Sequence, residues 1–410
     1  MEQMKCNISA NGLFRPLRSG LSLRQKAGYQ MKTRTTQKFE NWSGILKRYS
    51  ADILFFGISI FLPLFMENGY LNLTQAKAHA VYIIVFLSVI VFAIATTCAR
   101  RERHNAKNPA KMKGLDDILI AFAVTLALSA LCSQKPLESF SDSAGRNVGA
   151  FTMLCLVVAY FIISRYYTAR VNAWFFVLIA NSIIFLLTIV NSAGIDVSGT
   201  HANIVPEQFY LYVSTLGNVN WLSGYLCLIL PAFLIFYMLS TQRATTLLYG
   251  AVLILGIMNI LLCGSESIFA GIWVCTFFVL PFLLKESRRL QKLGTMLIAF
   301  GLSALFIRYV PVFAEKRNTE HGLFSIILDW KTALIICLLG FLCCFILPML
   351  WEKLSEQTIQ KITIILEILM FISLLILAYV FLKSYSESWG NYRGRIWNTS
   401  MEIFQNLGVR

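Results

Sequence analysis

The sequence has little charge and no arrangement of residues that would hold a metal. Only 14% of its 410 residues are charged, whereas a soluble domain usually carries about a quarter. The cysteines form no CxxC pair, and nearly all of them lie in or beside apolar runs, where they act as small hydrophobic side chains. The four histidines are scattered without ligand spacing. We therefore expect no metal, no redox motif and no cofactor.

Signals for nucleic-acid binding are also missing, although the formal net charge is +15. The chain has no dense basic helix with interleaved aromatics, no zinc-finger motif and no RNA-binding signature. The basic N-terminal segment, residues 1–49, lacks the apolar core of a signal peptide. We expect this segment to be a disordered cytoplasmic tail, and Met31 is as good a start as Met1.

Apolar residues, in contrast, are abundant, at 57% of the chain with 31 phenylalanines. A membrane-spanning helix needs roughly 20 mainly apolar residues, and about eleven such segments can be placed. We therefore predict an all-α, polytopic integral membrane protein with a helical core at residues 50–383. The predicted spans are 50–66, 79–98, 116–132, 149–164, 172–192, 219–239, 245–263, 267–284, 293–312, 331–350 and 362–382.

The basic residues orient these spans. The N-terminal segment and every second connection hold 25 of the 36 lysines and arginines, and the other connections and the C-terminal tail hold 11. Because basic residues are enriched on the cytoplasmic side, we predict that the N-terminus is inside and the C-terminus outside. The net charge then reflects topology, and no nucleic-acid partner is needed to explain it.

Polar residues on the predicted outer face are the informative ones. Arg146 begins the fourth span between Gly145 and Gly149, which would let a ligand approach the backbone. Its planar fork of donors suits a phosphate, but an arginine at this place could also snorkel to lipid headgroups. Arg393 and Arg395 repeat this chemistry near the C-terminus, where the alternative is an interfacial belt of aromatic and cationic side chains.

Asn218 and Asn220, in the stretch GNVNWLSG, directly precede a long apolar run. Amides are costly in hydrocarbon unless they find partners. They could join two helices by a hydrogen bond, or they could line a cavity where the helix entry is broken. Glu266, in the turn GSES at 264–267, has the simpler interpretation of a solvated acid in a tight turn.

Taken in order and on one predicted side, these stretches resemble the O-antigen ligase and O-antigen polymerase superfamily. GNVNWLSGYLCLILP is similar to the Gly-Asn-x-Asn start of a central span, and SFSDSAGRNVGAF to an outer loop with an arginine just before a new span. RGRIWNTSMEIF resembles the beginning of the large external loop. CGSESIFAGI resembles a serine-rich turn, although Glu266 stands where many members have arginine. The resemblance covers most of the chain from about residue 50.

The resemblance implies a bacterial, multi-pass enzyme of the cytoplasmic membrane. Such an enzyme transfers a glycan from a polyprenyl-diphosphate carrier to an acceptor hydroxyl on a lipid, a glycan or a protein, without a metal. It implies that Arg146, Arg393 and Arg395 contact the diphosphate and that Asn218 and Asn220 line the cavity. No residue is assigned to the chemical step, and the sequence does not separate a ligase from a polymerase.

One departure leaves the activity open. The family's external loop continues further and carries a histidine proposed as the general base, whereas here residues 384–410 form only the beginning of such a loop. His321 stands at the wrong place to match that histidine. We therefore expect a truncated loop, and an inactive remnant of the same fold is one alternative. A lipid-linked glycan transporter or flippase is another, although internal repeats and midplane charges, which would favour it, are not evident.

Overall fold

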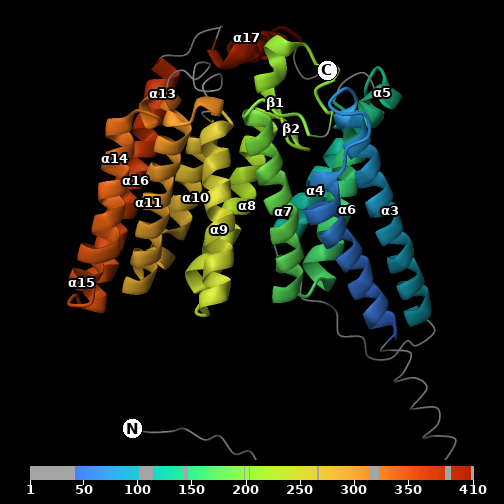
Figure 1. Ribbon diagram of the computed structural model, residues 1–410. Helices are drawn as coiled ribbons and strands as arrows, with labels where there is room; N and C mark the ends of the chain where they lie inside the picture. The colour runs from blue at the N-terminus through green and yellow to red at the C-terminus, as the bar shows by residue number, and fades with distance from the viewer. Residues whose placement is uncertain are drawn as a thin grey trace, which may run out of the picture. The chain divides into compact units, whose positions relative to one another are not determined.

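The computed structural model describes residues 42–100, 114–142, 146–197, 199–202, 204–265, 267–313, 323–383 and 389–407. In this part of the chain nearly every residue is helical, and the only strands are β1 (Tyr212–Val213) and β2 (Gly217–Asn218). The predicted all-α class is therefore confirmed. The chain divides into unit 1, Met1–Leu62 with Lys77–Arg170, and unit 2, Pro63–Ala76 with Val171–Arg410. Within each unit the long helices run side by side (Figure 1).

Eight of the described helices are long and apolar enough to cross a membrane. They match eight of the eleven predicted spans, and the other three correspond to the helix of residues 42–64 and to the 17-residue helices α4 and α6. The chain is thus a multi-pass membrane protein, while the number of spans and their orientation stay predictions. The eight are Leu73–Cys98, Asn172–Ser192, Val219–Leu239, Arg243–Leu262, Ser267–Leu284, Ser287–Tyr309, Trp330–Trp351 and Glu356–Val380.

Unit 1 is built on close packing between its first helix and α3. The hydroxyl of Ser43 donates to the carbonyl oxygen of Ala95 over 2.9 Å, and Ser50 does the same to Ser88 over 3.0 Å, so the two helices run antiparallel. Residues 42–49, which we assigned to the N-terminal segment, already belong to this first helix, and residues 1–41 lie outside the described part. The helices of unit 1 are 42–56, continued by η1 (Gly57–Phe61) and α2 (Leu62–Leu64), then α3 (Leu73–Arg100), α4 (Leu115–Leu131), α5 (Pro136–Ser141) and α6 (Ala150–Tyr166), and the end of α2 and the first turn of α3 fall in unit 2.

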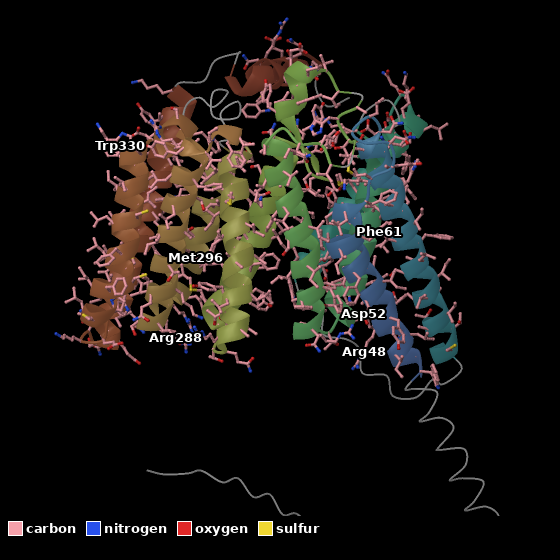
Figure 2. All side chains as sticks on the ribbon, viewed as in Figure 1. Arg48, Asp52, Phe61, Arg288, Met296 and Trp330 are labelled. Carbon is pink, nitrogen blue, oxygen red and sulfur yellow. The ribbon has the colours of Figure 1, made fainter. Side chains whose placement is uncertain are left out.

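One end of unit 1 is fixed by ion pairs. Arg165 at the end of α6 donates to Asp116 at the start of α4 over 2.8 Å, and Asp116 is buried. Arg170 pairs with Asp52 at the same end, where Figure 2 also shows Arg48. A buried carboxylate needs such a partner, because an unpaired charge in the protein interior is strongly destabilising. The connection between α5 and α6, which carries Arg146, lies at the other end of this unit.

Unit 2 holds the remaining helices and the short hairpin. Its elements are α7 (Val171–Ser192), η2 (Pro206–Leu211), β1, β2, α8 (Val219–Leu239), α9 (Arg243–Leu262), α10 (Ser267–Leu284), α11 (Ser287–Tyr309), η3 (Pro311–Phe313), α13 (Leu323–Ile327), α14 (Trp330–Phe341), η4 (Leu342–Ile346), α15 (Leu347–Trp351), α16 (Glu356–Lys383) and α17 (Trp389–Leu407). Small residues allow α11 and α14 to pack closely: a Cβ on Gly294 of α11 would lie 2.5 Å from the carbonyl oxygen of Gly340 in α14. Such small-residue contacts are typical of helix packing in membranes.

The basic connections of unit 2 also close helix ends. Helix α11 begins at Ser287 and not near residue 293 as predicted, so its first turns contain the buried Arg289 and Lys292. The Lys292 ammonium donates to the carbonyl oxygens of Tyr237 and Ser240, each over 2.6 Å, at the end of α8. The last carbonyls of a helix lack the usual intrahelical donor, and Lys292 adds one here beside the amide and hydroxyl of Ser240, which also donate to the carbonyl of Tyr237. Figure 2 shows the neighbouring Arg288 at one end of unit 2 and Trp330 at the other.

Candidate functional site

The start of α8 gives Asn218 a structural role. We call this end of unit 2, with β1, β2 and the starts of α8 and α10, the hairpin end. The Asn218 side chain accepts a hydrogen bond from the amide of Asn220 over 2.8 Å, which is the geometry of a helix N-cap. Gly217 has a φ of 88°, which favours glycine, and its backbone pairs with Val213 in the hairpin. The Gly-Asn pair therefore turns the chain from the hairpin into the helix.

Asn220 instead belongs to a network that joins α8 to the turn before α10. Its side-chain oxygen accepts a hydrogen bond from the hydroxyl of Ser265 over 2.8 Å. The Ser265 hydroxyl lies 2.8 Å from that of Ser267, which lies 3.1 Å from that of Ser223. The fold thus brings together the GNVN and GSES stretches, as a helix-to-helix bond would require. Glu266 lies outside the described residues.

A ladder of weak polar contacts continues this pairing deeper along α8 and α10. The Cys275 thiol donates to the carbonyl oxygen of Cys227 over 3.6 Å. That carbonyl has no intrahelical donor because the residue four positions on is Pro231, which has no backbone N–H. On the same face Gly271 allows a close approach, since a Cβ there would lie 2.4 Å from the sulfur of Cys227.

Beyond this ladder lies an apolar cavity of about 370 Å³ between α8, α9, α10 and α11. Its lining includes Pro231 and Leu234 of α8, Val279 of α10 and Met296 of α11, which Figure 2 shows midway along unit 2. This space is half open and not enclosed. A dry apolar lining does not hold water, so we expect hydrocarbon to fill this space.

A second polar cluster at the hairpin end was not predicted from the sequence. His201 is buried, with its Nε2 atom 3.0 Å from the carbonyl oxygen of Tyr212 and its Nδ1 atom 3.6 Å from Asp196. The Asp196 carboxylate accepts hydrogen bonds from the amides of Thr200 and His201 over 3.0 and 2.9 Å. A cavity of about 90 Å³ lies beside this pair and is also lined by Asn191. The signal available in the sequence was an Asp close before Gly-Thr in a loop, which is typical of a turn closed by an aspartate side chain.

Burial and hydrogen bonds shift the pKa values of two side chains in this cluster, Asp196 and Tyr70. Burial alone would raise the pKa of Asp196, but the hydrogen bonds from His201 and Thr200 outweigh it and lower the pKa below its usual value. Burial raises the pKa of Tyr70 to about 12, and the nearby Asp196 adds to this shift while a hydrogen bond with Thr200 opposes it. The Tyr70 hydroxyl donates to the carbonyl oxygen of Ser214 over 2.7 Å. The cluster therefore holds an ionised carboxylate and a neutral phenol near pH 7.

Arg146 is exposed in the connection between α5 and α6. Its amide donates to the Asp142 carboxylate over 3.1 Å, and its guanidinium has no partner among the described residues. The space beside Gly149 is not open to a ligand, because a Cβ there would lie 2.4 Å from the carbonyl oxygen of Phe140. Arg146 belongs to unit 1 and the two asparagines to unit 2, so a cavity shared by these residues stays a prediction.

The two C-terminal arginines lie on helix α17. Arg395 is exposed, whereas the side chain of Arg393 and all of His321 lie outside the described residues. Across the described ranges no group of three or more His, Cys, Asp or Glu could hold a metal ion.

Comparisons of the chain with protein-family models, with curated proteins and with solved structures gave no match. The resemblance to the O-antigen ligase superfamily therefore rests on the quoted stretches.

Proposed function

We propose that the protein transfers a glycan from a polyprenyl-diphosphate carrier to an acceptor hydroxyl at the outer face of a bacterial cytoplasmic membrane. The observation that supports it best is the arrangement along α8 and α10, where a network of amide and hydroxyl groups stands above an apolar cavity. Ser223 and Leu230 are seven residues apart on α8, which is about 10 Å of helix. This arrangement suits a ligand with a polar head and a long hydrocarbon tail.

Asn220 is the group in this network that is best placed for a head group. Its side chain is exposed, and the bond from Ser265 to its oxygen fixes the plane of the amide. Its nitrogen has no partner in the described part of the chain, so two N–H donors remain for a sugar or phosphate oxygen. Ser267, also exposed, adds a hydroxyl beside it.

Arginines would supply the charge that amides lack. In this proposal Arg146, Arg393 and Arg395 hold the diphosphate, and they stabilise the charge that develops on it as it leaves. Each hydrogen bond to a charged group is worth about 1.5–3 kcal/mol. The donor is the same for a ligase and a polymerase, so the proposal covers both.

The test compares two basic residues that lie on either side of α5, between α4 and α6. In proteoliposomes supplied with a lipid-linked glycan and an acceptor, Arg146→Lys should lower transfer at least about tenfold, or about 1.4 kcal/mol. A lysine keeps the charge but loses the bidentate fork. The matched control is Lys135→Ala, because Lys135 is exposed and pairs with Glu138 over 3.2 Å. Product is read by gel shift after equal insertion of both variants is shown.

Three outcomes would count against the proposal in different ways. Equal transfer by Arg146→Lys and the parent would remove Arg146 from the diphosphate site. No transfer by the parent chain would favour an inactive remnant of the fold. Movement of a labelled carrier lipid between leaflets without transfer would favour a transporter, which the same cavity and polar network could also serve.

A further inference from the structure

Helix α17 has two contrasting faces. At about 100° per residue, Ile396, Met401, Ile403 and Phe404 fall with Trp397 in an arc of about 160°. Arg395 and the polar residues Asn398, Glu402, Gln405 and Asn406 fall in the opposite arc. Two polar positions, Arg393 and Ser400, fall within the apolar arc. The Ser400 hydroxyl is satisfied, because it donates to the carbonyl oxygen of Ile396 over 2.8 Å.

The apolar face of α17 is not buried by the fold. The exposed fractions are 61% for Ile396, 57% for Met401, 52% for Ile403 and 61% for Phe404. The helix is also too polar to span a membrane, and it is not among the candidate spans found in the described residues. A helix with one broad apolar face and low overall hydrophobicity is typical of a segment that lies in a membrane interface.

The place of α17 in the chain indicates which surface covers this face. The preceding helix α16 is a candidate span up to Val380, and only residues 384–388 separate α16 from α17. Five residues reach at most about 18 Å, so α17 must stay near the level at which α16 leaves the membrane. Figure 1 shows it at the hairpin end of unit 2.

We propose that α17 lies flat on the membrane that the spans cross, with its apolar face between the headgroups and the acyl chains. The helix carries Arg393, Arg395 and Glu402, so its formal charge is +1. With so little charge, the apolar face supplies the binding, and anionic lipids should change it little. This inference does not depend on the proposed glycan transfer.

The experiment uses the full chain in nanodiscs, with its native cysteines replaced and single cysteines labelled with an environment-sensitive fluorophore. Two pairs of neighbours differ by about 160° around the helix axis: Phe404→Cys against Glu402→Cys, and Ile403→Cys against Gln405→Cys. Nitroxides on the lipid acyl chains should quench the Phe404 and Ile403 labels at least about threefold more than their partners. Aqueous iodide should show the opposite order, with and without anionic lipid.

Equal quenching of both faces would overturn the proposal. Protection of the apolar labels from both quenchers would also overturn it, because the face would then be buried against protein. If such protection is lost on dilution to one chain per disc, the partner is a second copy of the chain.

A second measurement keeps the native cysteines and is informative if the cysteine-free chain does not reconstitute. In nanodiscs, Ile403→Glu combined with Phe404→Glu should speed tryptic cleavage after Arg395 at least about tenfold, because local release from the membrane exposes the backbone. The control is Gln405→Glu combined with Asn406→Glu, which adds the same charge to the polar face and should leave the rate unchanged. Equal rates in the two double variants would contradict the membrane-bound helix.

Discussion

Replacing Lys292 by methionine should measurably weaken unit 2. The Lys292 side chain is 7% exposed and lies in the second turn of α11. Its ammonium donates to the carbonyl oxygens of Tyr237, Met238 and Ser240, which close the C-terminal end of α8. Methionine fills a similar volume but donates no hydrogen bond. The carbonyls of Met238 and Ser240 would then lose this donor, whereas the carbonyl of Tyr237 would keep its bonds from the amide and the hydroxyl of Ser240.

The magnitude follows from the two shortest contacts, each 2.6 Å long. Hydrogen bonds to a charged group are worth about 1.5–3 kcal/mol each. Release of an ordered lysine returns up to about 2 kcal/mol of side-chain entropy. We therefore expect Lys292→Met to lower the free energy of unfolding by about 1–4 kcal/mol, a large share of the stability of an ordinary domain.

Arg288→Met is the matched control, because Arg288 is exposed and precedes Lys292 by one turn of the same helix. Its effect should stay within about 0.5 kcal/mol. Both variants would be unfolded reversibly in mixed micelles by titration with a denaturing detergent, followed by circular dichroism. If the two variants unfold at the same detergent fraction, Lys292 contributes nothing to the stability of unit 2.

Two further predictions concern the hairpin end. Asn218→Ala removes the N-cap of α8 and should lower the free energy of unfolding by about 1 kcal/mol, whereas Asn218→Asp, which keeps the acceptor, should lower it less; equal losses in the same titration would argue against capping. The Asp196 side chain has a lower pKa in the folded protein than in the unfolded chain, where it is 3.8. Its carboxylate therefore stabilises the fold at pH values above 3.8, and this stabilisation should be lost as the pH falls through the pKa of the folded state. The neutral Tyr70 phenol stabilises the fold at pH values below 10.0, its pKa in the unfolded chain. This stabilisation should be lost as the pH rises toward about 12, its pKa in the folded protein. The melting temperature should therefore depend less on pH in the acid range for Asp196→Asn and less on pH in the alkaline range for Tyr70→Phe. An unchanged pH dependence in either variant would contradict the role given to that side chain.

Apolar run length predicts the central helices of this chain closely. The predicted spans 219–239 and 267–284 coincide with α8 and α10, because polar residues and glycine stand directly before each of them. The start of α11 was predicted too late, since the sequence pattern treats Arg289 and Lys292 as loop charges. In the fold both side chains reach carbonyl groups of neighbouring helices, and a hydropathy pattern does not register such a partner.

The site was only partly predictable, because its contacts cross the sequence. Asn220 and Ser265 are 45 residues apart, and their bond exists only once α8 and α9 have packed side by side. The sequence marks Asp196 only as a turn residue, and His201 itself gives no signal, because its partners are that carboxylate five residues before it and a backbone carbonyl eleven residues after it. A side chain that binds a backbone group cannot be recognised from the sequence, because the backbone partner can belong to any residue type.

The two asparagines of GNVN show how a structural and a functional role can be separated. Asn218 is accounted for by the turn and the helix cap, which need an acceptor at that position. Asn220 is exposed, so its amide needs no protein partner to avoid a desolvation cost. Its bond to Ser265 would be worth only about 0.6 kcal/mol if it served helix packing alone. The same bond orients two unused N–H donors above the apolar cavity, and we therefore expect Asn220→Ala to impair binding of a lipid-linked glycan more than it impairs the fold.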